Sequence, residues 1–257
     1  MKEKQKKAKT DKVKKKKPKK KLLFRFLKGV IKLFYKKSKF IDLENIPNEP
    51  CIITGNHAKM HGPLMCGGYF PLNKRIWCDA PMMNRKDFPE YAINTFFGGK
   101  KGFFTRLAVW FLTPIITYVF KHADTLAVYR DMRVMSTYKE SIDALEDGNH
   151  LLILPECPTP KDDIVNYFNE YFVDTARLYY KKSKKELQFV PMYYAAELRI
   201  VKFGKPIKFN ASNPIDEERK RICAYLEESI YEIAKGMPEH TVIPFHAVPK
   251  DQLKKNK

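Results

Sequence analysis

The feature of this sequence that most restricts its fold is an alternation of short apolar runs with longer helical patterns along the body of the chain. Six runs read as strands: Cys51–Thr54, Arg75–Asp79, Thr125–Tyr129, His150–Leu154, Gln188–Tyr194 and Arg199–Phe203. Such alternation is typical of domains in which helices connect and cover parallel strands. We therefore expect an α/β fold, a single domain with a largely parallel central sheet flanked by helices.

Three helices are predicted between and after these strands. The pattern over Asp131–Asp147 ends at Gly148, a residue common just past a helix. Aromatic residues at helical spacing predict a second helix over Ile164–Lys182. The last helix is expected to be capped by Asn213, with Pro214 in its first turn.

The positive charge of the chain is concentrated at its start. Residues 1–40 carry +17 of the formal net charge of +20, so the rest of the chain is nearly balanced. Residues 1–21 are rich in lysine, have no apolar periodicity and are predicted to be disordered. Lysine without interleaved aromatics attracts nucleic acid only nonspecifically, so no specific nucleic-acid partner is expected.

Residues 22–39 predict a basic amphipathic helix that binds an anionic membrane surface. At about 100° per residue, Arg25, Lys28, Lys32 and Lys36 share one side and apolar residues fill a broad arc elsewhere. The alternative is a core helix whose lysines face water. The lysine arm before it favours the membrane, because each basic residue adds attraction to anionic lipid. The expected organisation is then an arm (1–21), this helix (22–39), the α/β domain (40–236) and a C-terminal tail (237–257).

Composition also indicates where such a protein resides. The five cysteines are odd in number and lack paired spacing, which is typical of reduced thiols in a cytosolic protein. No signal peptide is recognised. The longest uncharged apolar run, Leu107–Phe120, has 14 residues and contains Pro114, whereas a spanning helix needs about 20. We expect a peripheral protein on the cytoplasmic face of a membrane.

Candidate site residues follow the strands, where sites of open α/β sheets form. Asn56 and His57 come after the first strand, Arg130 after the third, and Pro155 and Glu156 after the fourth. A base, a fixed cation and a carboxylate at one sheet edge favour an anionic substrate that undergoes proton-assisted transfer.

In their order and spacing these segments resemble the four blocks of the glycerolipid acyltransferase family, typified by 1-acylglycerol-3-phosphate acyltransferases. Asn56-His57 matches the first block, Arg130 the second, Pro155-Glu156 the third, and Val190-Pro191 the fourth. The resemblance covers roughly residues 40–210 in the family's order.

The resemblance implies transfer of a fatty acyl group from acyl-CoA or acyl-carrier protein to the hydroxyl of a lysophospholipid. His57 would be the general base, a role typically worth about 10²–10⁴ in rate. Arg130 would pair with the acceptor's phosphate, and Asn56, Pro155 and Glu156 would complete the acceptor site. A thiolate leaves readily, so the resemblance implies no cofactor beyond the acyl thioester. His57 and His61 lack a third ligand nearby, so no metal is expected.

The chain departs from the family at Gly62, where the family carries an aspartate that orients the histidine. Loss of the equivalent carboxylate from a serine-protease triad lowers kcat by about 10⁴. His61, one helical turn after His57, is the nearest substitute, either as its partner or as the base itself; Glu156, Asp79 and Asp131 are others. The alternative function is a catalytically silent relative that binds anionic phospholipid.

Overall fold

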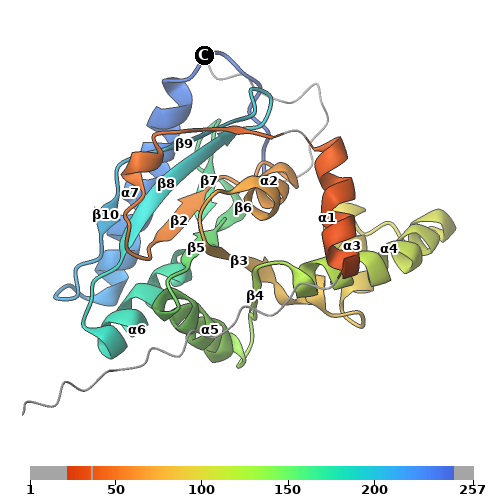
Figure 1. Ribbon diagram of the computed structural model, residues 1–257, viewed down its shortest axis with the longest axis horizontal. Coiled ribbons are helices and arrows are strands. Elements are labelled where there is room, and N and C mark those ends of the chain that lie inside the picture. The colour runs from red at the N-terminus through yellow and green to blue at the C-terminus, as the bar shows by residue number, and fades with distance from the viewer. Residues whose placement is uncertain (1–21, 36, 246–257) are drawn as a thin grey trace, which may run out of the picture.

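The computed structural model describes residues 22–35 and 37–245 (Figure 1). The predicted lysine arm and the end of the predicted C-terminal tail lie outside the described residues. The helices are α1 (Leu22–Phe34), α2 (His61–Tyr69), α3 (Phe88–Phe96), α4 (Phe103–His122), α5 (Val134–Glu146), α6 (Asp174–Ser183) and α7 (Ile215–Lys235). The strands are β1 (Lys39–Ile41), β2 (Ile52–Gly55), β3 (Lys74–Asp79), β4 (Thr125–Val128), β5 (His150–Ile153), β6 (Glu156–Pro160), β7 (Asn166–Phe168), β8 (Gln188–Ala195), β9 (Ile200–Phe203) and β10 (Ile207–Lys208).

The central sheet has the order β1-β9-β8-β2-β5-β3-β4, with β10 beside β8. The pairs β8–β2, β2–β5, β5–β3 and β3–β4 are parallel, and the pairings of β8 with β9 and β10 are antiparallel. The prediction of an α/β domain with a largely parallel sheet is therefore confirmed. Because β2, β5, β3 and β4 run in the same direction, the residues that follow them meet at one edge.

The sheet is buried on both faces, as alternate residues of its central strands show. Ile52, Leu151 and Ile153 pack with α5, α6 and α7 in one apolar core, which also contains Leu145 of α5, Ala176 of α6 and Leu226 of α7. Ile53 and Leu152 pack into a second core with Met65 and Cys66 of α2. A two-sided core explains why these strands appear in the sequence as continuous apolar runs. All five cysteines are free thiols.

The helix predicted over Ile164–Lys182 is wrong in its first half. Residues Asn166–Phe168 form β7, which pairs antiparallel with β6, and α6 begins only at Asp174. The backbone N–H of Phe168 donates to the buried carboxylate of Glu227 at 2.8 Å. Hydrogen bonds of this kind satisfy an extended backbone, so tertiary contacts override the helical spacing of the aromatics.

The start of the last helix also differs by one residue. Pro214 holds the N-cap position of α7, and the side chain of Asn213 donates to Glu218 at 2.8 Å instead of capping the helix. Glu218 accepts from the backbone N–H of Asn210 as well, at 2.8 Å. The helix start is therefore held by a carboxylate inside the helix.

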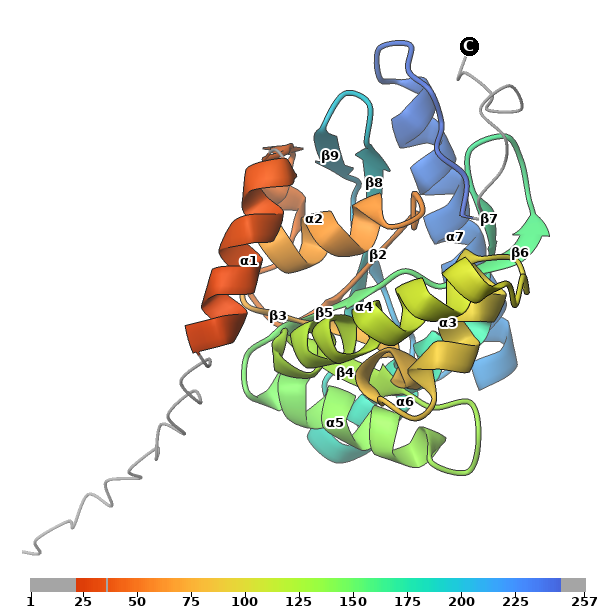
Figure 2. The same ribbon diagram turned by 90° about the vertical axis from the view of Figure 1, so that its right-hand side faces the viewer.

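The N-terminal helix forms where it was predicted but ends earlier, at Phe34, and Lys39 already belongs to β1. Its lysines do not all face outward. Lys28 donates to the carbonyl of Gly67 in α2 at 3.1 Å, and Lys32 lies over the ring of Tyr69, 4.9 Å from its centroid. The outer side carries Leu22, Leu23, Phe26 and Leu33, all exposed. Figure 1 places α1 with α3 and α4 at one end of the molecule, away from α7, and Figure 2 views the molecule from that end.

Candidate active site

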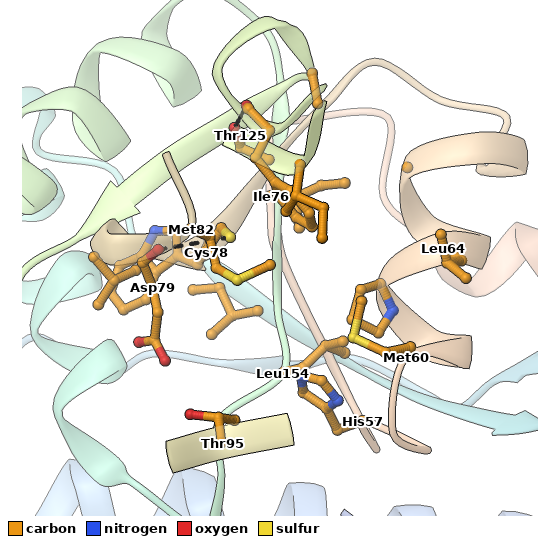
Figure 3. A pocket seen from close by; sticks show the side chains of 18 of the residues that line it. His57, Met60, Leu64, Ile76, Cys78, Asp79, Met82, Thr95, Thr125 and Leu154 are labelled. Carbon is orange, nitrogen blue, oxygen red and sulfur yellow. Dashed lines mark hydrogen bonds between the residues drawn. The ribbon is translucent and has the colours of Figure 1, made fainter. Parts of the chain in front are cut away.

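The carboxyl edge of the parallel strands opens into a cavity of about 1220 Å³. His57 after β2, Arg130 after β4, and Pro155 and Glu156 after β5 all line it. Figure 3 places His57 and Met60 on one side of the cavity and Asp79 and Met82 on the other. The strands of His57 and Arg130 are three positions apart in the sheet, roughly 14 Å at the usual strand spacing. The two side chains therefore flank the cavity from opposite sides.

The His57 ring is oriented by a backbone carbonyl. Its Nδ1 is hydrogen-bonded to the carbonyl oxygen of Lys59. A carbonyl oxygen can only accept, so Nδ1 carries the ring proton and the lone pair of the neutral imidazole is on Nε2. Phe245 packs edge-on against the ring, with centroids 5.1 Å apart.

This carbonyl reaches His57 because the chain turns through two left-handed residues. Ala58 has φ 45° and Lys59 has φ 54°, a conformation that costs a residue other than glycine roughly 1–2 kcal/mol. The turn then leads into α2, where the N–H of His61 donates to the carbonyl of Ala58 at 3.0 Å. The position of His57 thus depends on a strained turn built from local backbone bonds.

Glu156 holds the loop between β2 and α2 through the backbone of His57. Its side chain is buried and accepts hydrogen bonds from the backbone N–H groups of His57 and Asn166, the latter at 3.1 Å. Burial raises the pKa of Glu156 to about 7, and the two backbone bonds act in the opposite direction. Both carboxylate oxygens are engaged by the protein, so the geometry favours a positioning role over contact with an acceptor phosphate.

Asn56 fixes the other end of the loop. Its side-chain oxygen accepts from the N–H of Tyr194 in β8 at 2.8 Å, and its amide donates to the carbonyl of Tyr194 at 3.2 Å. Pro155 accepts through its carbonyl from the N–H of Asn169 at 2.8 Å. These residues hold β2, β8 and the β5 end in register around His57.

Gly62 occupies a position with no room for a side chain. A Cβ atom there would lie 2.5 Å from the carbonyl oxygen of His57. The N–H of Gly62 donates to that same oxygen at 3.1 Å. The close backbone approach accounts for glycine at this position, and it excludes an aspartate in this conformation of the loop.

His61 faces the N-terminal helix. Its Nδ1 lies 3.2 Å from the hydroxyl of Tyr35, which also hydrogen-bonds to the hydroxyl of Tyr194 at 2.8 Å. Burial, and then the nearby charge of Lys59, lowers the pKa of His61. His61 therefore belongs to a polar link between α1, α2 and β8.

Arg130 is mostly exposed and forms an ion pair with Asp79 at 3.2 Å, its side chain being 79% exposed. Asp79 also accepts from the hydroxyl of Tyr91 at 3.0 Å. Asp131 is paired with Arg133 at the surface, which lowers the pKa of Asp131 to about 2. The carboxylates considered as replacements for the family's aspartate, including Glu156, thus have other partners, and Lys59 supplies the acceptor at Nδ1.

Sequence reasoning missed three members of this site. The Lys59 carbonyl is a backbone atom and leaves no side-chain signature. Tyr35, just past α1, and Tyr91, in α3, are remote from His57 in the sequence. Within residues 22–35 and 37–245, no group of three or more His, Cys, Asp or Glu side chains is placed to hold a metal ion.

Comparisons with known proteins complete the description of the site. No protein-family model matches the chain, and no curated protein matches it. Among solved structures, the chain is similar to the 1-acyl-sn-glycerophosphate (LPA) acyltransferase PlsC from Thermotoga maritima, with 15% sequence identity and a TM-score of 0.49. The match covers 84% of this chain and 81% of that chain.

Proposed function

We propose that this protein transfers a fatty acyl group from an acyl thioester to the hydroxyl of a lysophospholipid, with His57 as general base. The observation that carries the proposal is the orientation of His57 at the cavity, where its Nδ1–H faces a carbonyl and its Nε2 holds the lone pair. The resemblance of the four sequence segments to glycerolipid acyltransferases supports the same reaction.

The reaction is balanced without a cofactor. Nε2 of His57 accepts the proton of the acceptor hydroxyl as its oxygen bonds to the thioester carbon. The tetrahedral intermediate then breaks its carbon–sulfur bond, and the imidazolium returns the proton to the departing thiolate. The donor is acyl-CoA or acyl-carrier protein, and the products are a phospholipid and the free thiol.

The Lys59 carbonyl performs part of the role of an aspartate. It selects the tautomer and orients the ring, as a carboxylate would. A neutral acceptor stabilises the developing imidazolium less, because a carboxylate would add the Coulomb attraction between two opposite full charges. We therefore expect a lower turnover than a carboxylate-supported histidine would give, with the same dependence on His57.

Arg130 is proposed to bind the acceptor's phosphate at the far side of the cavity. Its guanidinium is mostly exposed and paired with Asp79, and an exposed pair of this kind is worth only about 0–1 kcal/mol. A phosphate can therefore compete for Arg130 at little cost. Asn56, Pro155 and Glu156 would act through the loop they hold, and His61 through its link to α1.

The reaction is proposed to occur at the cytoplasmic face of an anionic membrane. The exposed outer residues of α1 (Leu22, Leu23, Phe26 and Leu33) and the +17 charge of residues 1–40 support peripheral binding. Apolar side chains would enter the lipid while basic ones contact its headgroups.

The proposal is tested by incubating the purified full chain with labelled acyl-CoA or acyl-carrier protein and a panel of lysophospholipids, lysophosphatidic acid among them. We expect labelled phospholipid, and a loss of at least about 100-fold in rate for His57→Ala. His122→Ala, which changes a histidine hydrogen-bonded within α4, is the matched control and should retain the wild-type rate. Lipid binding without transfer from either donor would instead establish the silent alternative.

A further inference from the structure

Helix α4 exposes large apolar side chains, whereas a surface helix of a water-exposed domain usually buries them. Its buried residues are Val109, Thr113 and Thr117, and the two threonine hydroxyls bond to carbonyls one turn back, at 2.6 and 2.7 Å. Its outward residues are Phe103, Phe104, Leu107, Trp110 and Phe111, all exposed. Two of the three buried side chains of α4 are thus polar, whereas five large apolar side chains face away from the protein.

Few contacts within the protein cover this outer surface. Only 17% of the most apolar 18-residue stretch of α4 is buried inside the protein. Phe104 and Trp110 are 83% and 73% exposed. Scattered exposed apolar residues are ordinary, but a contiguous aromatic surface marks an interaction site. Trp and Phe on one helix face are typical of helices that lie at a lipid interface.

We propose that α4 inserts into one leaflet of a lipid bilayer and lies in the plane of the interface. Its 20 residues are enough, by length and composition, to cross a membrane. However, its inner face packs against α3 through Val109, which shares a core cluster with Phe88 and Ala92, and its end leads directly into β4. If α4 crossed the membrane, α3 and β4 would enter the hydrocarbon with it. A position parallel to the membrane surface is therefore the one compatible with the fold.

Charge around the helix favours lipid over a second protein as the occupant. Exposed Lys100, Lys101 and Arg106 stand at its start and Lys121 at its end. Exposed Arg25 lies on α1, which contacts α4. An apolar surface bordered by basic residues matches the acyl chains and phosphates of an anionic leaflet. A second copy of this chain would bring like charges together.

The same helix separates this surface from the cavity. Leu112, Ile115, Ile116, Val119 and Phe120 line the cavity that contains His57. On α1, Phe24 and Ile31 line it as well. An acyl chain could therefore pass from the leaflet between α1 and α4 to His57 without entering water. This access route rests on the proposed function, whereas insertion of α4 does not.

The insertion is tested by the fluorescence of Trp110, one of only two tryptophans. The full chain is mixed with vesicles of phosphatidylglycerol and phosphatidylcholine, with and without brominated acyl chains. We expect a blue shift and bromine quenching on binding. Trp110→Phe keeps an aromatic surface, so it should bind as wild type but lose the quenching.

A second pair of variants measures how much the helix contributes to binding. Trp110→Ser with Phe111→Ser is expected to weaken vesicle partitioning at least about tenfold, because burial of two large apolar side chains is lost. Tyr167→Ser removes an exposed aromatic from β7 and should leave partitioning unchanged.

Failure of this inference can be told apart from failure of the proposed function. Unchanged partitioning of the double variant, together with no bromine quenching of Trp110, would overturn α4 insertion whatever the activity. A dimer in solution that the double variant dissociates, without quenching, would overturn it as well. Quenching and weakened partitioning in a protein that transfers no acyl group would uphold insertion and reject only the reaction.

Discussion

At the scale of single residues, the site depends on backbone atoms as much as on side chains. His57 is oriented by the carbonyl of Lys59, and its own N–H is held by Glu156. The left-handed turn at Ala58 and Lys59 makes the first of these contacts possible. Strained non-glycine residues concentrate at functional sites, where the rest of the structure over-determines them.

Substitutions at Lys59 distinguish the contribution of its backbone carbonyl from that of its side chain. Lys59→Gly keeps the carbonyl and relieves the positive φ, so we expect stability to rise by up to about 1 kcal/mol and the rate of acyl transfer to be retained. Lys59→Pro cannot adopt the turn, because proline fixes φ near −65°, and it should abolish transfer. Both are measured by urea unfolding and by the transfer assay. Loss of activity in Lys59→Gly would show that the amine, not the carbonyl, is required.

Gly62 and Gly67 offer a matched pair in helix α2. Gly62→Ala places a Cβ against the His57 carbonyl and is expected to destabilise the protein by about 1–3 kcal/mol. Gly67→Ala meets no atom within 4 Å and should stabilise the helix by about 0.5–1 kcal/mol. Equal effects of the two substitutions on urea unfolding would contradict the close approach at Gly62.

Glu156 makes stability depend on pH. Its pKa is raised from 4.5 to about 7, so between these values the folded state retains a proton that the unfolded chain releases. The free energy of unfolding should therefore fall as pH rises through this window, by about 3 kcal/mol at most. Glu156→Gln should remove this slope and, because its amide faces a backbone N–H, lower stability throughout. An unchanged slope in the variant would assign the pH dependence to other groups.

Most residues of the candidate site could be predicted from the sequence, but the contacts that support them could not. The strand-end positions of His57, Arg130 and Glu156 follow from the order of apolar runs. That Glu156 turns its carboxylate to the backbone of His57 could not be foreseen, since the sequence says nothing about the path of the loop between β2 and α2.

At the scale of elements, Tyr35 is one of the links that attach α1 to the domain. Tyr35, just past the end of α1, bonds to His61 in α2 and to Tyr194 in β8. Tyr35→Phe removes these bonds, and we expect it to lower stability by about 1 kcal/mol and to speed amide hydrogen exchange in α1. Tyr167→Phe changes an exposed tyrosine and is the control. Unaltered exchange in α1 would mean that the other contacts of the helix, such as the bond from Lys28 to Gly67, hold it without Tyr35.

Strands β6 and β7 were not predicted, because their sequences have patterns that are typical of loops or helices. Strand β6 contains two prolines, and the aromatics of β7 are at helical spacing from Tyr171 and Phe172, which follow the strand. Both are extended because they pair with each other, and in β7 the carboxylates of Glu156 and Glu227 also accept the N–H groups of Asn166 and Phe168. By contrast, β2, β5 and β8 are buried on both faces, and their continuous apolar runs made them predictable from the sequence.

At the scale of the whole molecule, the fold places an end with exposed apolar side chains beside the sheet edge that carries the candidate site. The parallel strands bring His57, Glu156 and Arg130 to the cavity, and α1 and α4 line its wall and carry exposed apolar side chains. The alternation of strands and helices predicted the sheet, but not the outward direction of the aromatics of α4, because an apolar helix has the same composition whether it faces a core or a lipid.

The measurement that tests this account most directly is a comparison of kcat for acyl transfer to lysophosphatidic acid in wild type, His57→Ala and His61→Ala. The two histidines are four residues apart and differ in their partners, a carbonyl for His57 and Tyr35 for His61. The account predicts a loss of at least about 100-fold for His57→Ala and a change of only a few fold for His61→Ala. A fully active His57→Ala, or a large loss confined to His61→Ala, would contradict it.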